Sequence, residues 1–532
     1  MKKETALFII IFTMIGFFIG ANTAEIKNTF IIETAGNKLD AVLGLIDESY
    51  VDSVSIDSLI ENSIPKILTE LDPHSKYIPT EEVEESNADL QSSFSGIGIR
   101  FTIQDDTIHI GEVIRGGPSE KAGMLAGDRI IKVNDTLFVG KDVCNNNTAM
   151  KKLKGKKGSF VKIAVMRYGE KDLLDFNIIR DDIPVQSIEA AYMIDDKWGY
   201  VQVERFAEGT FAEFIQSLAY FMANKAKGII IDLRGNGGGY MGIAIEMANQ
   251  FLSQGDVIVY TEGEHSPKKT EYANGYGMFR DMPLVVLVDE TSASASEILA
   301  GTIQDNDRGI IIGRRTFGKG LVQQPFELPD GSAIRLTIAR YHTPSGRCIQ
   351  KPYTKGDVKE YAMDLVERYN RGEFFSQDSI HQNESLIYST RKGRKVHGGG
   401  GIMPDIFVSS DTADMTSYAQ DALSRGLISR FALKYSDTNR QTLAKYKTYE
   451  TLTKYLASQP VVEEFVTFAK DRGLKPRYNL IKKSRKIISR ALYSNITYQV
   501  LGMLEHVKYI NESDSTVLKA IEVLEKGEAT IE

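Results

Sequence analysis

Residues 284–313, LVVLVDETSASASEILAGTIQDNDRGIIIG, decide the fold class, because two apolar runs flank a serine-rich turn and a helical stretch. The runs LVVLV and GIIIG have the length and β-branched composition of buried strands. Similar runs occur earlier, as WGYVQV at 198–203, GIIIDL at 228–233 and DVIVYT at 256–261. Because helical stretches lie between these strands, the alternation predicts an α/β core.

Three further regions surround that core, which we place at residues 181–411. Residues 25–88 carry two apolar faces at helical spacing and predict an N-terminal helical region. Residues 89–180 consist of short strands and glycine turns, and residues 412–532 are rich in helical patterns. The fold class is therefore multidomain α/β, with an inserted β-rich module and helical N- and C-terminal regions.

Residues 1–24 have the composition of a targeting segment. Lys2 and Lys3 precede a charge-free apolar run over residues 6–21, which is short for a membrane span and long for a signal-peptide core. A cleaved signal peptide and an uncleaved anchor would both export the rest of the chain. Because Asn22 would occupy position −3 of a cleavage site, we expect a retained anchor, membrane association through the N-terminus, and a periplasmic or other extracytoplasmic place in the cell envelope. A buried N-terminal helix is the alternative.

Composition argues against several classes of ligand. The 532 residues carry a net charge of −7, so nothing attracts nucleic acid in general. Cys144 and Cys348 lie far apart in the sequence without metal-ligand spacing, although a disulfide between them stays open. The seven histidines form no His-x-x-x-His pair. We expect no metal, no organic cofactor and no nucleic-acid partner.

The segment GRRTFGKGLVQQP at 313–325 nearly spells a phosphate-binding loop. Its G-x-x-x-x-G-K pattern is complete, but Gly320 stands where a Ser or Thr hydroxyl would hold magnesium. A phosphate loop also begins a helix, and Pro325 lies inside the segment that would be that helix. A nucleotide site is therefore disfavoured, and Lys319 needs another partner.

Two turns of the same core offer such a partner. SASASE at 292–297 lies between a strand and a helix, where a serine nucleophile can be held exposed near helix N–H groups. The structural alternative is a capping box formed by Ser294 and Glu297, and the three alternating serines leave open which one matters. DLRGNGGGY at 232–240 presents backbone N–H groups to an oxyanion, or is only a tight connection.

These segments together resemble the signature of the C-terminal processing peptidases, also called tail-specific proteases. In that family the middle serine of S-A-S-A-S-E is the nucleophile and the lysine of F-G-K-G, 25 residues later, is the base, which here implies Ser294 and Lys319. The family's third catalytic member falls on Gln323. Asp305 also matches a family position, and its role is less clear. A serine endopeptidase is the function that the resemblance implies.

The resemblance extends over residues 35–410. LDPHSKYIP at 71–79, YHTPSGRCIQ at 341–350 and GGGGIMPDIFV at 398–408 are similar to further family blocks. For the oxyanion hole it implies N–H donors at Gly238 and Ala295. Asn236-Gly237 departs from many members, which leaves open which glycine of 237–239 completes the hole.

A lysine base must be neutral before it accepts a proton, although its ordinary pKa is about 10.4. Burial lowers a lysine pKa by up to about 3–5 units, and Phe317 and Leu321 flank Lys319. The amide of Gln323 can orient the amine without favouring its charged form. His342 is the alternative base of a conventional triad.

The β-rich module resembles a PDZ domain. SGIGIRF at 95–101 is similar to the loop whose N–H groups hold a peptide C-terminus while the peptide extends a sheet. The resemblance assigns that binding to Ile97, Gly98 and Ile99. It does not say whether the module activates or inhibits.

We therefore expect an exported Ser/Lys endopeptidase that cleaves proteins near or from their C-termini and recognises substrate tails through its PDZ domain. A catalytically inactive PDZ scaffold that binds protein C-termini is the alternative from another class, and a nucleotide hydrolase is the third. The sequence leaves the substrates and a homo-oligomer open.

Overall fold

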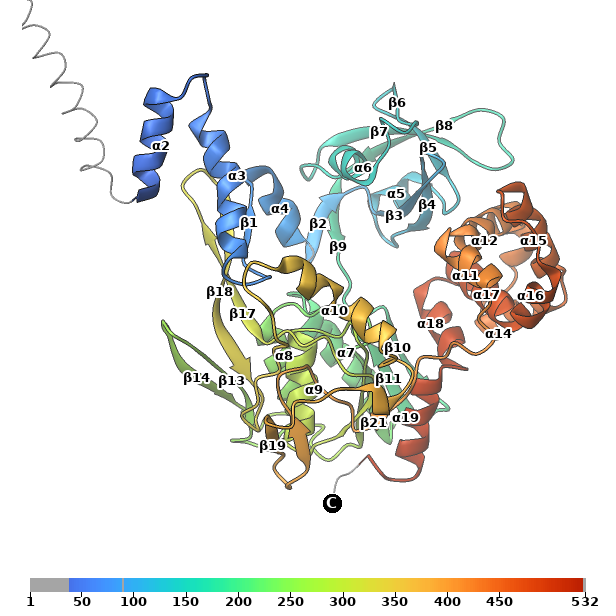
Figure 1. Cartoon of the computed structure of the whole chain (residues 1–532). Helices are drawn as coiled ribbons and strands as arrows, with labels where there is room; N and C mark the ends of the chain where they lie inside the picture. The colour runs from blue at the N-terminus through green and yellow to red at the C-terminus, as the bar shows by residue number, and fades with distance from the viewer. Residues whose placement is uncertain (1–37, 89, 530–532) are drawn as a thin grey trace, which may run out of the picture. The chain divides into compact units, whose positions relative to one another are not determined.

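A computed structural model of the chain describes residues 38–88 and 90–529 (Figure 1). The predicted signal peptide or anchor at residues 1–24 lies outside the described residues. Within the described ranges, no helix has both the length and the apolar character that crossing a bilayer requires. The chain divides into a small N-terminal unit and a large unit that starts at Ile78.

The N-terminal unit contains the two helices that the apolar spacing predicts. They are α2 (Lys38–Ser49) and α3 (Ile56–Thr69), and the Ser55 side chain caps α3 by accepting the Ser58 N–H. In the motif after α3, the Asp72 carboxylate accepts the backbone N–H groups of His74 and Ser75. The helix has by then ended at Thr69, with Glu70 as its C-cap. The strand β1 (Lys76–Ile78) and the helix α4 (Thr80–Ala88) follow in the sequence.

A six-stranded sheet with the order β10-β11-β12-β15-β16-β21 forms the centre of the large unit. Strand β10 is antiparallel to β11, and the other neighbours are parallel. Every residue of β12 and β15 is buried, which explains their unbroken apolar runs. The strands are β10 (Ala190–Ile194), β11 (Trp198–Gln202), β12 (Gly228–Asp232), β15 (Leu284–Val288), β16 (Ile310–Gly313) and β21 (Ile406–Phe407).

Helices cover both faces of this sheet, so the predicted α/β core is confirmed (Figure 1). On one face α7 (Thr210–Ala223), α8 (Met241–Ala248) and α9 (Ala295–Asp305) bury their apolar side chains. On the other face lie α18 (Met503–Asn511) and α19 (Ser515–Glu525). The last helices of the predicted C-terminal region thus belong to the hydrophobic core of the sheet.

A second, antiparallel sheet takes one strand that the sequence assigns to the α/β alternation. Strand β13 (Val257–Gly263) pairs with β14 (Ser266–Tyr272) and β18 (Ala333–His342), and β18 also pairs with β17 (Leu321–Glu327). The segment DVIVYT is apolar although it is not a strand of the central sheet, because Ile258 and Val259 pack into the hydrophobic cluster that contains α9.

The β-rich module is an insertion between two paired strands, β2 (Ser93–Gly96) and β9 (Asp181–Pro184). Gly96 lies opposite Asp181, so both ends of the insertion are neighbours. Its antiparallel sheet closes over a core that includes Ile108, Ile130 and Val161. Its elements are β3 (Ile99–Gln104), β4 (Thr107–Val113), α5 (Pro118–Ala122), β5 (Arg129–Val133), β6 (Thr136–Leu137), α6 (Asn146–Leu153), β7 (Phe160–Met166) and β8 (Leu174–Ile179).

The rest of the chain is mostly helical. After α10 (Val358–Asn370) and η1 (Gln377–Ser379), a short hairpin joins β19 (Ile387–Ser389) and β20 (Lys395–His397). A helical bundle with its own hydrophobic cluster then precedes α18. Its helices are α11 (Ser417–Ser424), α12 (Leu427–Thr438), α13 (Arg440–Leu443), α14 (Tyr449–Ala457), α15 (Val461–Asp471), α16 (Tyr478–Lys483) and α17 (Arg485–Leu501).

Candidate active site

The three turns selected from the sequence begin at the carboxyl ends of three neighbouring strands. Strand β12 ends at Asp232, β15 at Val288 and β16 at Gly313, and the strands are paired in parallel. The glycine-rich turn, the serine turn and the lysine loop therefore start from one edge of the sheet. In open α/β sheets this is the edge at which sites form.

The three serines of the serine turn differ in burial and in hydrogen bonding. Ser292 and Ser296 are fully buried, and their hydroxyls donate to the carbonyl oxygens of Leu233 and Asn236 at 2.8 and 2.9 Å. Ser294 is partly exposed and has φ 57° and ψ −114°. A positive φ at a non-glycine residue is strained and is typical of a serine held on a sharp strand-to-helix turn. This geometry favours Ser294 among the three.

The glycine-rich turn is attached to the serine turn by Asn236. Its backbone carbonyl accepts the N–H of Ala293 and the hydroxyl of Ser296, and its side chain binds the carbonyl of Val203. The Asn236 Oδ1 also accepts the Gly238 N–H at 2.8 Å. The residue that departs from many family members therefore holds the two turns together.

Gly238 lies directly against the predicted nucleophile. It has φ +104°, and a Cβ on it would come within 2.7 Å of the Ser294 Cβ. Only glycine fits there, but its N–H already donates to Asn236 in this structure. Ala295 is the first residue of α9, so its N–H precedes the helical hydrogen-bond ladder. The assignment of both as oxyanion donors stays a prediction.

The lysine loop does not adopt the conformation of a phosphate-binding loop. Strand β17 follows it instead of a helix. A Cβ on Gly320 would lie 2.8 Å from the backbone nitrogen of Gln350, so the hydroxyl residue of a phosphate loop has no room. The Lys319 Nζ, which is partly buried, donates to the Oε1 of Gln323 at 2.9 Å. The predicted base and its predicted orienting amide are thus in contact.

Two buried side chains join the serine turn to the lysine loop through backbone atoms. One oxygen of Glu297 accepts the N–H of Ser294 at 2.9 Å and the N–H of Lys319 at 2.8 Å. The Tyr341 hydroxyl lies between the carbonyl oxygens of the same two residues, 3.1 Å from that of Ser294. Both Glu297 and Tyr341 are buried. Together they fix the distance between the two backbones.

Glu297 is fully buried among four donors. Its other oxygen accepts the Thr316 hydroxyl at 2.5 Å and the Gly318 N–H at 2.8 Å. Burial raises the pKa of Glu297 to about 7, and the four hydrogen bonds oppose that rise. The carboxyl thus titrates near neutral pH.

Replacing Glu297 by Gln should change both activity and the pH dependence of stability. An amide cannot accept all four donors, so we expect kcat/KM to fall about tenfold to a hundredfold. The folded wild type holds its proton more tightly than the unfolded chain between about pH 4.5 and 7. Glu297 therefore contributes a loss of stability as pH rises through that window, up to about 3 kcal/mol, which Gln cannot show.

Urea unfolding of both proteins at pH 5 and pH 7.5 measures this difference. Relative to wild type, Glu297→Gln should gain stability at the higher pH. The exposed Glu525→Gln is the matched control and should show no such change. Parallel pH curves for wild type and Glu297→Gln would contradict the titration.

His342, the alternative base, is engaged elsewhere. Its ring stacks on Tyr260 with centroids 4.6 Å apart. Its Nδ1 lies 3.1 Å from the carbonyl oxygen of Gly346, and its Nε2 lies 3.4 Å from a carboxylate oxygen of Glu262. These contacts belong to the antiparallel sheet, and they favour Lys319 over His342 as the base.

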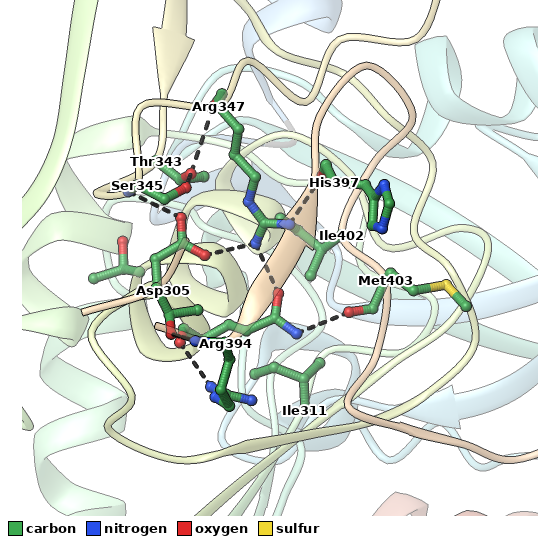
Figure 2. Close-up of polar contacts among 12 residues, drawn as sticks. Asp305, Ile311, Thr343, Ser345, Arg347, Arg394, His397, Ile402 and Met403 are labelled. Atoms are coloured by element: carbon green, nitrogen blue, oxygen red, sulfur yellow. Dashed lines mark hydrogen bonds and ion pairs between the residues drawn. The ribbon is translucent and has the colours of Figure 1, made fainter. Parts of the chain in front are cut away.

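Asp305 forms a buried ion pair (Figure 2). Its carboxylate accepts the Arg347 guanidinium at 2.7 Å and the Ser345 N–H at 3.1 Å, and the side chains of the ion pair are fully buried. Arg347 also donates to Gln304 Oε1 and to the carbonyl of His397. Asp305 thus ties the end of α9 to the loop that follows Tyr341, which gives a structural role to the unassigned aspartate.

The predicted carboxylate-binding loop lies at the start of β3. Ile97 is buried, and its carbonyl accepts both the N–H and the hydroxyl of Ser119. Gly98 has φ +76°, and a Cβ on it would lie 3.0 Å from Ile183. Ile99 begins the strand. Peptide binding by these three residues stays a prediction.

Sequence reasoning missed the double role of Glu297 and the whole role of Tyr341. The S-x-x-E spacing indicated only a helix cap, and the cap is present as the Ser294 N–H bond to Glu297. The second set of Glu297 bonds, to the lysine loop, depends on tertiary contact. Nothing in the local pattern around Tyr341 marks its hydroxyl.

Family models and relatives cover most of the chain. The model of peptidase family S41 matches residues 197–360, a PDZ domain model matches 95–178, and a family of unknown function matches 418–502. The carboxy-terminal processing protease CtpA of Bacillus subtilis is 33% identical over 390 residues, which cover 70% of this chain and 82% of that protein.

A second relative has a similar identity and coverage. The carboxy-terminal-processing protease of Bartonella bacilliformis is 33% identical, with 64% of this chain and 80% of that protein covered. The solved photosystem II D1 C-terminal processing protease is 23% identical, with 73% of this chain and 94% of that chain covered and a TM-score of 0.36, too low to carry an argument. With the PDZ domain and the serine and lysine turns already located, the chain belongs to the carboxy-terminal processing proteases of peptidase family S41 and is a serine-type peptidase.

Proposed function

We propose that this peptidase cleaves proteins near or from their C-termini through an acyl-enzyme formed on Ser294, with Lys319 as the general base. The observation that carries the proposal is the double connection of these two residues, through the Glu297 carboxylate and the Tyr341 hydroxyl. A nucleophile and a base held by shared backbone contacts are preorganised for proton transfer. The strained φ of Ser294 supports the same assignment.

In the first step the Ser294 Oγ attacks the scissile carbonyl while the neutral Lys319 amine takes the hydroxyl proton. Lys319 then returns a proton to the leaving amine, and water releases the acyl group by the reverse sequence. Gln323 accepts a hydrogen bond from the Lys319 Nζ. As a neutral amide it orients the amine without the attraction that a carboxylate would give to the protonated form.

We assign the oxyanion to the N–H groups of Ala295 and Gly238. For Gly238 this requires its N–H to leave the Asn236 Oδ1 when substrate binds. Gly237 and Gly239 are the alternatives in the same turn. Two N–H donors aimed at the carbonyl oxygen would stabilise the charge that develops on it.

We further propose that the PDZ domain selects substrates by their C-terminal carboxylates and that the N-terminal segment exports and anchors the enzyme at the membrane. The PDZ match and the SGIGIRF loop support the first part. The charge-free apolar run after Lys2 and Lys3 supports the second. The enzyme would then act in the periplasm or another extracytoplasmic space of the cell envelope.

Replacing residues 97–180 by a short Gly-Ser linker should change which substrates are cleaved and leave the catalytic turns intact. The paired positions Gly96 and Asp181 allow such a closure. Without the module, we expect cleavage of a C-terminally tagged unstructured protein to become insensitive to amidation of its C-terminus, because amidation removes the carboxylate.

The measurement is the initial rate on the free-acid and amidated forms of one substrate, with both enzymes. Wild type should prefer the free acid, and the shortened enzyme should not. An equal rate on both forms by wild type would contradict the sensor role. Cleavage of the substrate also separates this proposal from the alternative of a catalytically inactive scaffold, which would bind the tail and leave it intact.

A further inference from the structure

A cavity of about 530 Å³ lies behind the lysine loop. One wall is the Phe317 ring, two residues before Lys319, and another is the glycine run 398–401. The Lys351 backbone N–H donates to the Gly318 carbonyl, so the wall is continuous with the segment that carries the predicted base. The volume is that of a site for a side chain or a small ligand.

The charges that line this cavity do not balance. Among the residues that the structure describes, four cationic side chains line it and two carboxylates do so, those of Asp364 and Glu373. Glu373 is shared by three of the cations, at 2.6, 3.1 and 3.0 Å, and Asp364 pairs with the fourth. The cations are Arg315, Arg368, Arg371 and Lys351. The cavity therefore carries an excess of positive charge before its histidines are considered.

Two of these cations are also nearly buried, which makes the excess costly. The side chains of Lys351 and Arg368 are 6% and 2% exposed. Burial lowers the pKa of Lys351, and burial together with the neighbouring Arg315 lowers the pKa of Arg368. Buried charges are normally paired one to one. Lys351 pairs with Asp364 and Arg371 also pairs with Glu367, whereas Arg315 and Arg368 share Glu373, so the cluster is one carboxylate short.

Two residues that line the cavity each have a buried nitrogen without a hydrogen-bond partner. Among the described residues, neither the Arg315 Nε nor the His397 Nδ1 makes a hydrogen bond, although both atoms are buried. Figure 2 shows the His397 ring turned away from Asp305 and Arg347. A buried polar atom without a protein partner is satisfied by water, an ion or a ligand, so both atoms are open to a bound polar group.

We propose that this cavity binds a carboxylate of the peptide substrate, either the terminal one or an acidic side chain. The proposal rests on the proposed function and adds a second anchoring site beside the PDZ loop. Arginine forks bind carboxylates with two parallel hydrogen bonds. The position of the cavity behind Phe317 would place that carboxylate close to the lysine loop during cleavage.

The test is direct binding to the Ser294→Ala protein, which does not depend on turnover. Three labelled peptides of one sequence are compared by fluorescence anisotropy: an amidated peptide with a central Asn, its Asp twin, and the Asn peptide with a free C-terminus. The Asp twin should bind about fivefold more tightly than the amidated Asn peptide, although neither offers a terminal carboxylate to the PDZ loop.

Arg371→Gln tests the cavity with little risk to folding, because the Arg371 side chain is 42% exposed and pairs also with the exposed Glu367. It should reduce the gain from a carboxylate about threefold or more. Arg477→Gln, whose side chain is 44% exposed and pairs with Asp421 in the helical bundle, is the matched control and should leave the gain unchanged.

The peptide whose gain in affinity Arg371→Gln reduces identifies the source of the carboxylate. A gain of the Asp twin that Arg371→Gln reduces supports a side-chain carboxylate, and a gain of only the free-acid peptide that it reduces supports the terminal one. Gains that are absent, or unaffected by Arg371→Gln, overturn the proposal. Because binding is read without turnover, this result is independent of whether wild type cleaves, which a parallel assay of the unmodified enzyme decides.

Discussion

Ser294→Ala and Lys319→Ala should each reduce kcat/KM on a short peptide by about 10⁴–10⁶, and the double variant should be hardly slower than either one. The reason is that the hydroxyl and the amine act as one unit, so that removing either side chain removes the activated nucleophile. Neither substitution alters the backbone atoms that Glu297 and Tyr341 hold, so both variants should fold.

The neighbouring serines provide the controls. Ser292→Ala removes the hydrogen bond to the Leu233 carbonyl and the one that the hydroxyl accepts from the Asp289 N–H, and Ser296→Ala removes the hydrogen bond to the Asn236 carbonyl. We expect each to lose about 1–3 kcal/mol of unfolding free energy and to retain most activity at low temperature. If Ser292→Ala lost activity and Ser294→Ala kept it, Ser292 would be the nucleophile. If the losses of Ser294→Ala and Lys319→Ala were fully additive in the double variant, Lys319 would not act together with Ser294.

The central sheet was predictable because its strands are buried on both faces. The runs that became β12 and β15 are apolar at nearly every position, since helices cover both sides of the sheet. Such a run is recognisable without knowledge of its neighbours. The order of the strands in the sheet could not be predicted, because pairing depends on side chains far apart in the sequence.

Burial alone did not identify the sheet to which each strand belongs. DVIVYT resembles a core strand because Ile258 and Val259 pack into the main hydrophobic cluster, yet β13 pairs with β14 and β18. The sequence also did not show which surface α19 packs against. Its apolar spacing predicts an amphipathic helix and cannot show that the surface it covers lies more than 230 residues earlier, at Ile230 and Val285.

The active site also contains residues that the sequence identified and residues that only the structure showed. The family signature selected Ser294, Lys319 and Gln323, and the structure brings the amine and the amide into contact. The residues that connect the turns were less accessible. Asn236 looked like a departure from the family, although its side chain and carbonyl hold both turns. A bond between two loops leaves no periodic trace in the sequence.

The C-terminal helix should be essential for the stability of the peptidase core. Val523 in α19 is fully buried against the sheet. Val523→Asp should cost about 4 kcal/mol or more of unfolding free energy, because it removes an apolar contact and buries a charge without a partner. Leu518→Asp on the same helix is the control, since that side chain is 48% exposed and should change stability by less than about 0.5 kcal/mol.

The helix also reaches the active-site edge through its first residues, so the same substitution should abolish activity when the helix detaches. Asp514 caps α19 and accepts two hydrogen bonds from Arg234 at 3.0 Å, and Arg234 in turn pairs with Asp232, where the glycine-rich turn begins. Urea unfolding followed by tryptophan fluorescence reports on Trp198, which lies in the same cluster as Val523. If Val523→Asp and Leu518→Asp unfolded at the same urea concentration as wild type, α19 would be dispensable and the hydrophobic core would end before it.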